Sequence, residues 1–104
     1  MEYTFTVANF EEEVLNSPLP VLVDFYADWC GPCKMTGPVV EALSKVYTDV
    51  QFVKVNVDNN PEIASMYGIM SIPTLIGFKD GKEVNKTLGF HPQAELDKLV
   101  QEIR

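Results

Sequence analysis

Apolar and polar positions alternate along the chain in blocks that predict strands and helices in turn. Val21–Tyr26 is a nearly continuous apolar run bounded by prolines, which is typical of a strand covered on both faces. Strand character returns at Gln51–Val57. Two further strands, Thr74–Lys79 and Lys82–Leu88, flank Asp80-Gly81, a two-residue turn typical of a β-hairpin. We expect Val21–Tyr26 to be the central strand.

Helices are predicted between these strands, from capping residues and from apolar positions spaced by three or four. The longest follows Cys33, where apolar side chains recur on one helical face. Pro38 lies inside this helix, where it removes one backbone hydrogen bond and is expected to kink the axis. The other three helices are expected to begin at Asn9 and Asn60, as N-caps, and at Pro92.

These elements alternate in the order βαβαβαββα, which includes a strand before the first helix. A strand, a helix and the next strand form a right-handed parallel crossover. The pattern therefore predicts a three-layer α/β domain. The length of 104 residues fits one such domain over residues 1–104.

Composition and charge narrow the range of partners. The chain is 46% hydrophobic and 22% charged, which is typical of a globular domain with its own core. Its net charge is -7 and its basic residues do not cluster, so we expect no nucleic-acid partner. No apolar run approaches the ~18 residues needed to span a bilayer, and the N-terminal segment lacks the pattern of a signal peptide. We therefore expect a cytoplasmic protein with no membrane contact. We also expect it to be a monomer.

The two cysteines, Cys30 and Cys33, require a chemical explanation. A disulfide that closes so short a loop stabilises the fold by only about 2 kcal/mol through the entropy of the unfolded state. A domain of this size also does not need a disulfide to be stable. The pair lies where the central strand gives way to the longest helix, at the sheet edge where ligands and chemistry collect. The amides and dipole of a helix N-terminus would lower the pKa of Cys30 and favour its thiolate. The spacing therefore indicates a pair that switches between dithiol and disulfide.

Two other interpretations of the cysteine pair remain open. In the first, the pair is half of a zinc site; structural zinc usually takes four ligands, and His91 is the only other soft ligand in the chain. In the second, the cysteines are inert thiols of the core. The position of the pair beside an α/β pattern favours redox activity over both.

Several short segments, spread over the whole chain, form a recognisable set. They are Val23-Asp24-Phe25, Trp29-Cys30-Gly31-Pro32-Cys33-Lys34, Pro38, Lys54, Ile72-Pro73-Thr74 and Gly89. In order and spacing these segments resemble the thioredoxin family. The resemblance implies a thioredoxin fold, a three-layer α/β/α domain whose central mixed five-stranded sheet is flanked by four helices. It also implies a general protein disulfide reductase and electron carrier, with protein disulfides as substrates, a thioredoxin reductase that recharges it, and no bound cofactor or metal.

Asp24 and Lys54 are candidates for proton transfer. Asp24 is a charged residue in an apolar strand, where desolvation would raise its pKa; the alternative is a carboxylate at a strand end facing water. In the family the matching Asp lies buried beneath the second cysteine and exchanges a proton with it, so the resemblance assigns Asp24 as general acid/base for Cys33. Lys54 would be the charge partner of Asp24, and a solvated strand lysine is the alternative.

The resemblance also implies a flat, apolar docking surface around the dithiol. The family has a cis-proline at the position of Pro73, although sequence alone favours an ordinary turn proline. This would leave the backbone of Ile72 free to pair with an extended substrate chain. Met70 is a further candidate, or a simple packing residue. The expected surface consists of Trp29, Gly31, Pro32, Ile72, Pro73 and Gly89.

Three departures from the common family pattern, at four positions, leave the preferred reductase and targets open. Tyr26 stands where a second tryptophan is usual, Gly37 where alanine is frequent, and Met70-Ser71 where bacterial members commonly have a basic residue and glycine. Two alternative functions also remain. One is a disulfide oxidase or isomerase on the same fold, and the other is a non-catalytic interaction scaffold whose dithiol is idle.

Overall fold

A mixed four-stranded sheet forms the centre of the computed structural model, which describes residues 7–104. The strands lie in the order β2-β1-β3-β4. The central strand β1 (Val21–Tyr26) pairs in parallel with β2 (Gln51–Asn56) and antiparallel with β3 (Thr74–Lys79). β3 in turn pairs antiparallel with β4 (Lys82–Leu88). The expected position of Val21–Tyr26 inside the sheet is confirmed.

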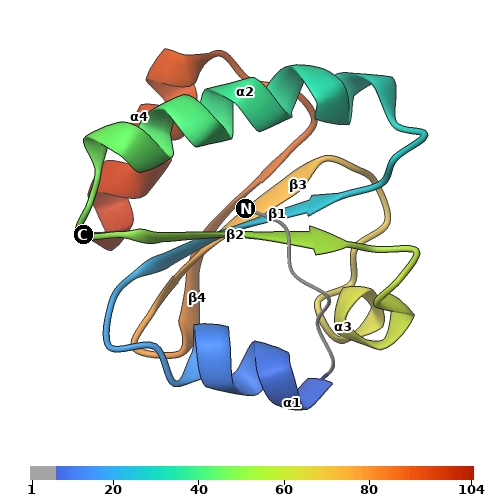
Figure 1. Cartoon of the computed structure of the whole chain (residues 1–104), viewed down its shortest axis with the longest axis horizontal. Coiled ribbons are helices and arrows are strands. Elements are labelled where there is room, and N and C mark those ends of the chain that lie inside the picture. Colours follow the sequence, from blue (N-terminus) through green and yellow to red (C-terminus); the bar gives the residue numbers. More distant parts are fainter. Residues whose placement is uncertain (1–6) are drawn as a thin grey trace.

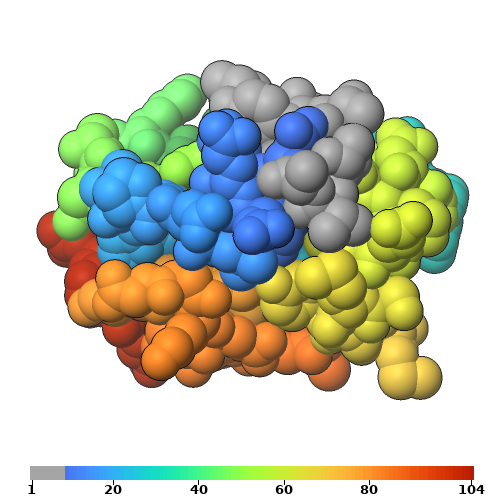
Figure 2. All heavy atoms as spheres, turned by 90° about the horizontal axis from the view of Figure 1, so that it is seen from below, coloured from blue at the N-terminus to red at the C-terminus, as the bar shows by residue number. Residues whose placement is uncertain are grey.

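Helices cover both faces of this sheet (Figure 1). The long helix α2 and the C-terminal helix α4 lie on one face, and α1 and α3 lie on the other. Figure 2 shows the second face, where the blue segment of α1 and η1 lies beside the orange β4. The bounds are α1 Val7–Phe10, η1 Glu11–Leu15 (a π-helical continuation of α1), α2 Gly31–Val46, α3 Pro61–Met66 and α4 Gln93–Ile103.

Alternation along β1 decides which residues face the long helix. Val21 and Val23 belong to an apolar cluster with residues of α1, η1 and α3. Leu22 belongs to the opposite cluster, with residues of α2 and α4. Asp24 and Tyr26 follow Leu22 at intervals of two, so their side chains point to the face that α2 covers. The candidate acid therefore lies on the same face as the helix that carries the cysteines.

The number of strands and the start of the first helix differ from what the sequence predicts. The sheet of residues 7–104 has four strands rather than five, and the strand expected before the first helix would fall on residues that the structure does not describe. Asn9 is not an N-cap, because the helix already includes Val7. Phe10 and Val14 are both 1% exposed. Burying such side chains against the sheet is worth more than the ~1 kcal/mol that a cap provides.

The predicted hairpin turn and helix boundaries are otherwise close to the observed ones. Asp80 and Gly81 both have positive φ, 54° and 76°, which matches the two-residue turn expected between β3 and β4. Pro38 lies inside α2, and Pro92 directly precedes α4. No helix among residues 7–104 is long and apolar enough to cross a membrane.

Candidate functional site

The two cysteines lie at the start of α2, directly beyond the carboxyl end of β1. Cys30 is the N-cap of α2 in an extended conformation, and its Sγ accepts a hydrogen bond of 3.2 Å from the backbone N–H of Cys33. The two residues form a disulfide with a Cα–Cα distance of 5.3 Å. Both are buried, at 4% and 6% exposure. The pair therefore opens and closes within one helical turn.

The sequence between the cysteines explains why the helix begins there. Pro32 fixes the first turn of α2, where its missing N–H costs no helical hydrogen bond. The hydroxyl of Thr36 donates to the carbonyl of Pro32 at 3.2 Å. Gly31 is exposed, and no heavy atom lies within 4 Å of the position that a side chain would occupy there. Gly31 thus leaves the approach to the disulfide open.

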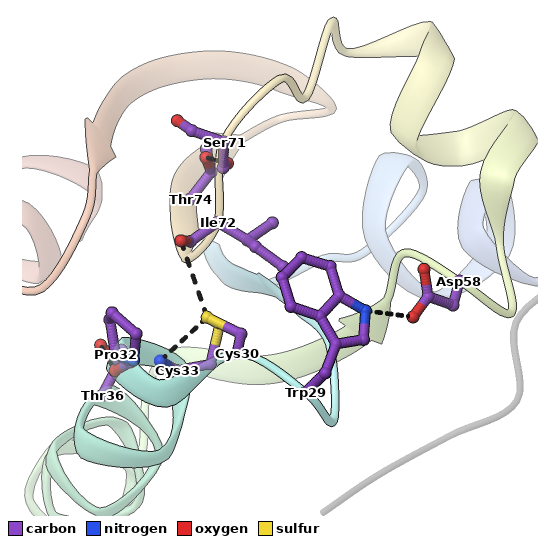
Figure 3. Close-up of a disulfide and its surroundings, with 9 residues drawn as sticks. All are labelled: Trp29, Cys30, Pro32, Cys33, Thr36, Asp58, Ser71, Ile72 and Thr74. Carbon is purple, nitrogen blue, oxygen red and sulfur yellow. Dashed lines mark hydrogen bonds between the residues drawn. A yellow bond between two sulfur atoms is a disulfide. The ribbon is translucent and has the colours of Figure 1, made fainter.

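A second segment, at the start of β3, lies opposite Cys30 (Figure 3). The Ile72–Pro73 peptide bond is cis, as the resemblance implied. The carbonyl oxygen of Ile72 lies 3.7 Å from the Sγ of Cys30. The N–H of Ile72 makes no hydrogen bond within residues 7–104, so it is available to a bound chain. The hydroxyl of Thr74 donates to the carbonyl of Ser71 at 2.6 Å and ties this loop together.

A third segment, after β4, is hydrogen-bonded to the cis-proline loop. The N–H of Gly89 donates to the carbonyl of Pro73 at 2.8 Å, and its φ of 79° lies in the region that favours glycine. Pro73 itself is buried, so it contributes little of its ring to a flat surface. Trp29, which precedes Cys30 in the chain, is 70% exposed, and Met70, two residues before Ile72, is 97% exposed.

Trp29 has a polar partner that the sequence did not reveal. Its indole N–H donates to Oδ2 of Asp58 at 2.8 Å (Figure 3). Asp58 follows β2, whose carboxyl end meets that of β1 at the same edge of the sheet. That placement was a usable signal, because polar residues at this edge of parallel strands tend to meet.

Asp24 is a buried carboxyl group without hydrogen-bond partners. It is 1% exposed, and neither of its oxygens has a partner within the described part of the chain. Burial raises the pKa of Asp24 from 3.8 to about 6, and the positive charge of Lys54 partly opposes that rise. The alternative of a carboxylate facing water is therefore wrong.

Lys54 is a neighbour of Asp24 rather than its ion-pair partner. The two residues are directly opposite each other in the β1–β2 register. The Nζ of Lys54 lies 4.5 Å from the centre of the Tyr26 ring, and no ion pair joins Lys54 to Asp24 in residues 7–104. Tyr26, Lys54 and Cys33 line one groove of about 920 Å³ beside α2. Lys54 therefore acts on Asp24 through space, from the wall of a groove.

Replacing Lys54 by methionine is expected to raise the pKa of Asp24 above about 6, because the charge that opposes its desolvation is removed. The measurement is an NMR titration of the Asp24 carboxyl carbon. Lys86→Met, at an exposed position of β4, serves as the control and should leave the titration unchanged. An unaltered titration in the Lys54 variant would contradict the assigned coupling.

His91, the other residue considered as a metal ligand, has hydrogen-bond partners of its own. Nδ1 of His91 lies 2.5 Å from Oε2 of Glu95, and its Nε2 lies 2.9 Å from the carbonyl of Leu88. The ring thus bridges the end of β4 and the start of α4. Within residues 7–104, no group of three or more His, Cys, Asp or Glu side chains is arranged to hold a metal ion.

Comparison with known proteins identifies the family. The thioredoxin family model matches residues 2–102. Among curated proteins, thioredoxin 1 of Synechococcus elongatus is 55% identical over 92 residues, covering 88% of this chain and 86% of that protein. Thioredoxin of Porphyra purpurea is 52% identical over 93 residues, covering 88% and 87%.

Solved structures agree with the sequence relatives. The thioredoxin of Fasciola hepatica superposes with a TM-score of 0.92 at 38% identity, and that of Plasmodium falciparum with 0.91 at 35% identity. Each covers 100% of both chains. Given these matches and the Cys30–Cys33 pair at the start of α2, the chain belongs to the thioredoxin family and is a thiol-disulfide oxidoreductase.

Proposed function

We propose that this chain is a general protein disulfide reductase and electron carrier in which Cys30 is the attacking thiol. The observation that carries the proposal is the position of Cys30 as N-cap of α2, with the N–H of Cys33 directed at its sulfur at 3.2 Å. The helix dipole and this hydrogen bond favour the thiolate of Cys30 in the reduced protein. Cys33 lies inside the first turn and is the resolving thiol.

The reaction transfers two electrons through a mixed disulfide. The Cys30 thiolate attacks one sulfur of a substrate disulfide, forms a bond to it and releases the other substrate sulfur as a thiolate, which takes a proton. Cys33 then loses its proton and attacks Cys30. The second substrate sulfur leaves as a thiol, and the Cys30–Cys33 disulfide remains. The substrate is reduced and the dithiol oxidised.

Asp24 is the proton acceptor for Cys33 in this proposal. Its side chain points to the face covered by α2, and a pKa of about 6 leaves it mostly ionised at neutral pH. Because it has no hydrogen-bond partner, the carboxylate is not already committed to another donor. The positive charge of Lys54, on the neighbouring strand, lowers the pKa of Asp24 and so partly offsets the effect of burial.

The substrate is proposed to bind as an extended segment along the cis-proline loop. Support comes from the unpaired N–H of Ile72 and from its carbonyl, which lies 3.7 Å from the Cys30 sulfur. An extended segment with its disulfide over Cys30 is the arrangement that these backbone groups fit. The exposed residues Trp29, Gly31 and Pro32 are proposed to form one side of this site. Pro73 is buried and is proposed to act through its cis peptide bond, and Gly89 donates a hydrogen bond to the carbonyl of Pro73.

The two-electron reaction requires two kinds of protein partner, an electron acceptor and an electron donor. Disulfide-containing proteins remove two electrons from the pair, and a reductase must return them; we assign that role to a thioredoxin reductase. A dithiol that must be regenerated works best in a reducing compartment, which supports a cytoplasmic location. One dithiol per chain is sufficient for the reaction, so we propose that the protein acts as a monomer.

Reduction of insulin disulfides with dithiothreitol as electron source tests the proposed function. We expect the chain to accelerate insulin precipitation well beyond dithiothreitol alone, and a sample with both cysteines alkylated to lose this effect. Titration against glutathione then separates reductase from oxidase or isomerase. A pair that stays reduced in a glutathione buffer as oxidising as that of the endoplasmic reticulum would contradict the proposal, as would the absence of insulin reduction.

A further inference from the structure

We propose that the two buried asparagines Asn56 and Asn60 are positioning residues for Trp29. They fix the turn that carries Asp58, and Asp58 holds the indole of Trp29 beside the disulfide. The proposal rests on the proposed function in one respect, namely that Trp29 contacts the substrate. The positioning itself is a structural statement that can be measured without any substrate.

Asn56 fixes the turn by accepting hydrogen bonds. It is the last residue of β2 and only 4% exposed. Its Oδ1 accepts from the backbone N–H of Asp58 at 2.9 Å and from that of Asn59 at 3.3 Å. The backbone of Asp58 is thereby held by a buried side chain.

Asn60 fixes the same turn by donating a hydrogen bond. It occupies the N-cap position of α3, as the sequence predicts, but its side chain makes no capping hydrogen bond. Instead its Nδ2 donates to the backbone carbonyl of Asn56 at 2.9 Å, and the residue is 5% exposed. A side chain expected to start a helix therefore closes the preceding turn.

This turn matters because the contact that it supports is exposed. Trp29 is 70% exposed and Asp58 is exposed as well. Two exposed side chains lose rotamer freedom when they are held together, so a single surface hydrogen bond orders them poorly. A backbone fixed by buried asparagines lowers that cost, because the backbone of Asp58 is already in place and only the two side chains remain to be ordered. The hydrogen bond of 2.8 Å from the indole to Asp58 is the result.

Asn56 accepts hydrogen bonds and Asn60 donates one, so replacement by aspartate should affect the two positions differently. A carboxylate can still accept at position 56, so Asn56→Asp should preserve the turn. At position 60 a carboxylate cannot donate and would face a carbonyl oxygen, so Asn60→Asp should release Asp58. Because the Asn60 side chain makes no capping hydrogen bond to α3, Asn60→Asp takes none away from that helix. Asn59→Asp is the matched control for added charge, because the Asn59 side chain is exposed and makes no hydrogen bond within residues 7–104.

The readout is the indole N–H resonance of Trp29, the only tryptophan of the chain. In Asn60→Asp we expect this resonance to move toward the position of a solvent-exposed indole and its hydrogen to exchange faster with water. In Asn56→Asp and Asn59→Asp we expect it to stay in place. With insulin as substrate, the KM of Asn60→Asp should rise about three- to tenfold, as expected when a substrate contact is lost, with kcat little changed.

Two results would overturn the proposal. One is an unmoved indole resonance in Asn60→Asp, and the other is a shift that Asn59→Asp reproduces in full, since charge alone would then account for it. Failure of the unmodified chain to reduce insulin would be a separate outcome. It would overturn the proposed function, whereas the indole resonances would still decide the positioning role.

Discussion

Replacing Cys30 by serine is expected to abolish the reduction of insulin disulfides, with a loss of roughly a thousandfold or more, as for removal of a covalent nucleophile. Serine keeps the size of the side chain, but its hydroxyl is a far weaker nucleophile and cannot form a disulfide. The N-cap hydrogen bond from the N–H of Cys33 can persist with an oxygen acceptor, so the fold should be retained. Turnover with dithiothreitol is the measurement.

The matched variant, Cys33→Ser, should behave differently at the same site. Cys30 can still attack, but no resolving thiol follows, so the mixed disulfide with the substrate should accumulate. Mass spectrometry under non-reducing conditions would show one substrate chain bound through Cys30. Full activity of Cys30→Ser, or trapping by Cys30→Ser instead of Cys33→Ser, would reverse the two assigned roles.

Replacing Asp24 by asparagine is expected to stabilise the oxidised protein at neutral and alkaline pH. The pKa of Asp24 is about 6 in the folded chain and 3.8 when unperturbed, so the unfolded state releases its proton first as pH rises. Folding stability is therefore lost between about pH 4 and about pH 6, and the cost is on the order of 3 kcal/mol above that range. Asparagine is neutral at every pH and avoids this cost.

Denaturant unfolding over a pH series tests this expectation. The unfolding free energies of the two proteins should nearly coincide at about pH 4 and differ by on the order of 3 kcal/mol at about pH 8. Glu62→Gln, at an exposed position of α3, is a control that should show no such divergence. A constant difference across the series would show that ionisation of Asp24 is not the cause.

Asp24→Asn should also resolve the mixed disulfide more slowly, because the acceptor for the Cys33 proton is missing.

Much of this fold could be predicted from sequence, because its signals are local. The apolar run Val21–Tyr26, the Asp80-Gly81 turn and the prolines at helix starts each determine structure over a few residues. The cysteine pair was also predictable, since its spacing and its position between a strand and a helix are visible in the chain. Its placement at the sheet edge follows from the order of the elements.

The parts that could not be predicted depend on contacts between distant segments. The order of the elements places Asp58 at the carboxyl edge of the sheet, but it does not show that its partner is Trp29, 29 positions away. Similarly, the Nζ of Lys54 lies over Tyr26 rather than against Asp24. The Asn60 side chain fits both a helix cap and a turn, and only the folded backbone shows which partner it takes. In each case local preference leaves several partners possible, and tertiary packing selects one.

The closeness of Cys30 to the cis-proline loop also limits how the protein can be used. Cys30 as a residue is 4% exposed, and its sulfur lies 3.7 Å from the carbonyl oxygen of Ile72, so little of this residue is open to a partner. The reductase and every substrate must exchange with that one sulfur, and they can do so only in turn. Turnover is then ping-pong: one partner has to leave before the next can bind, and different substrates compete for each reduced molecule.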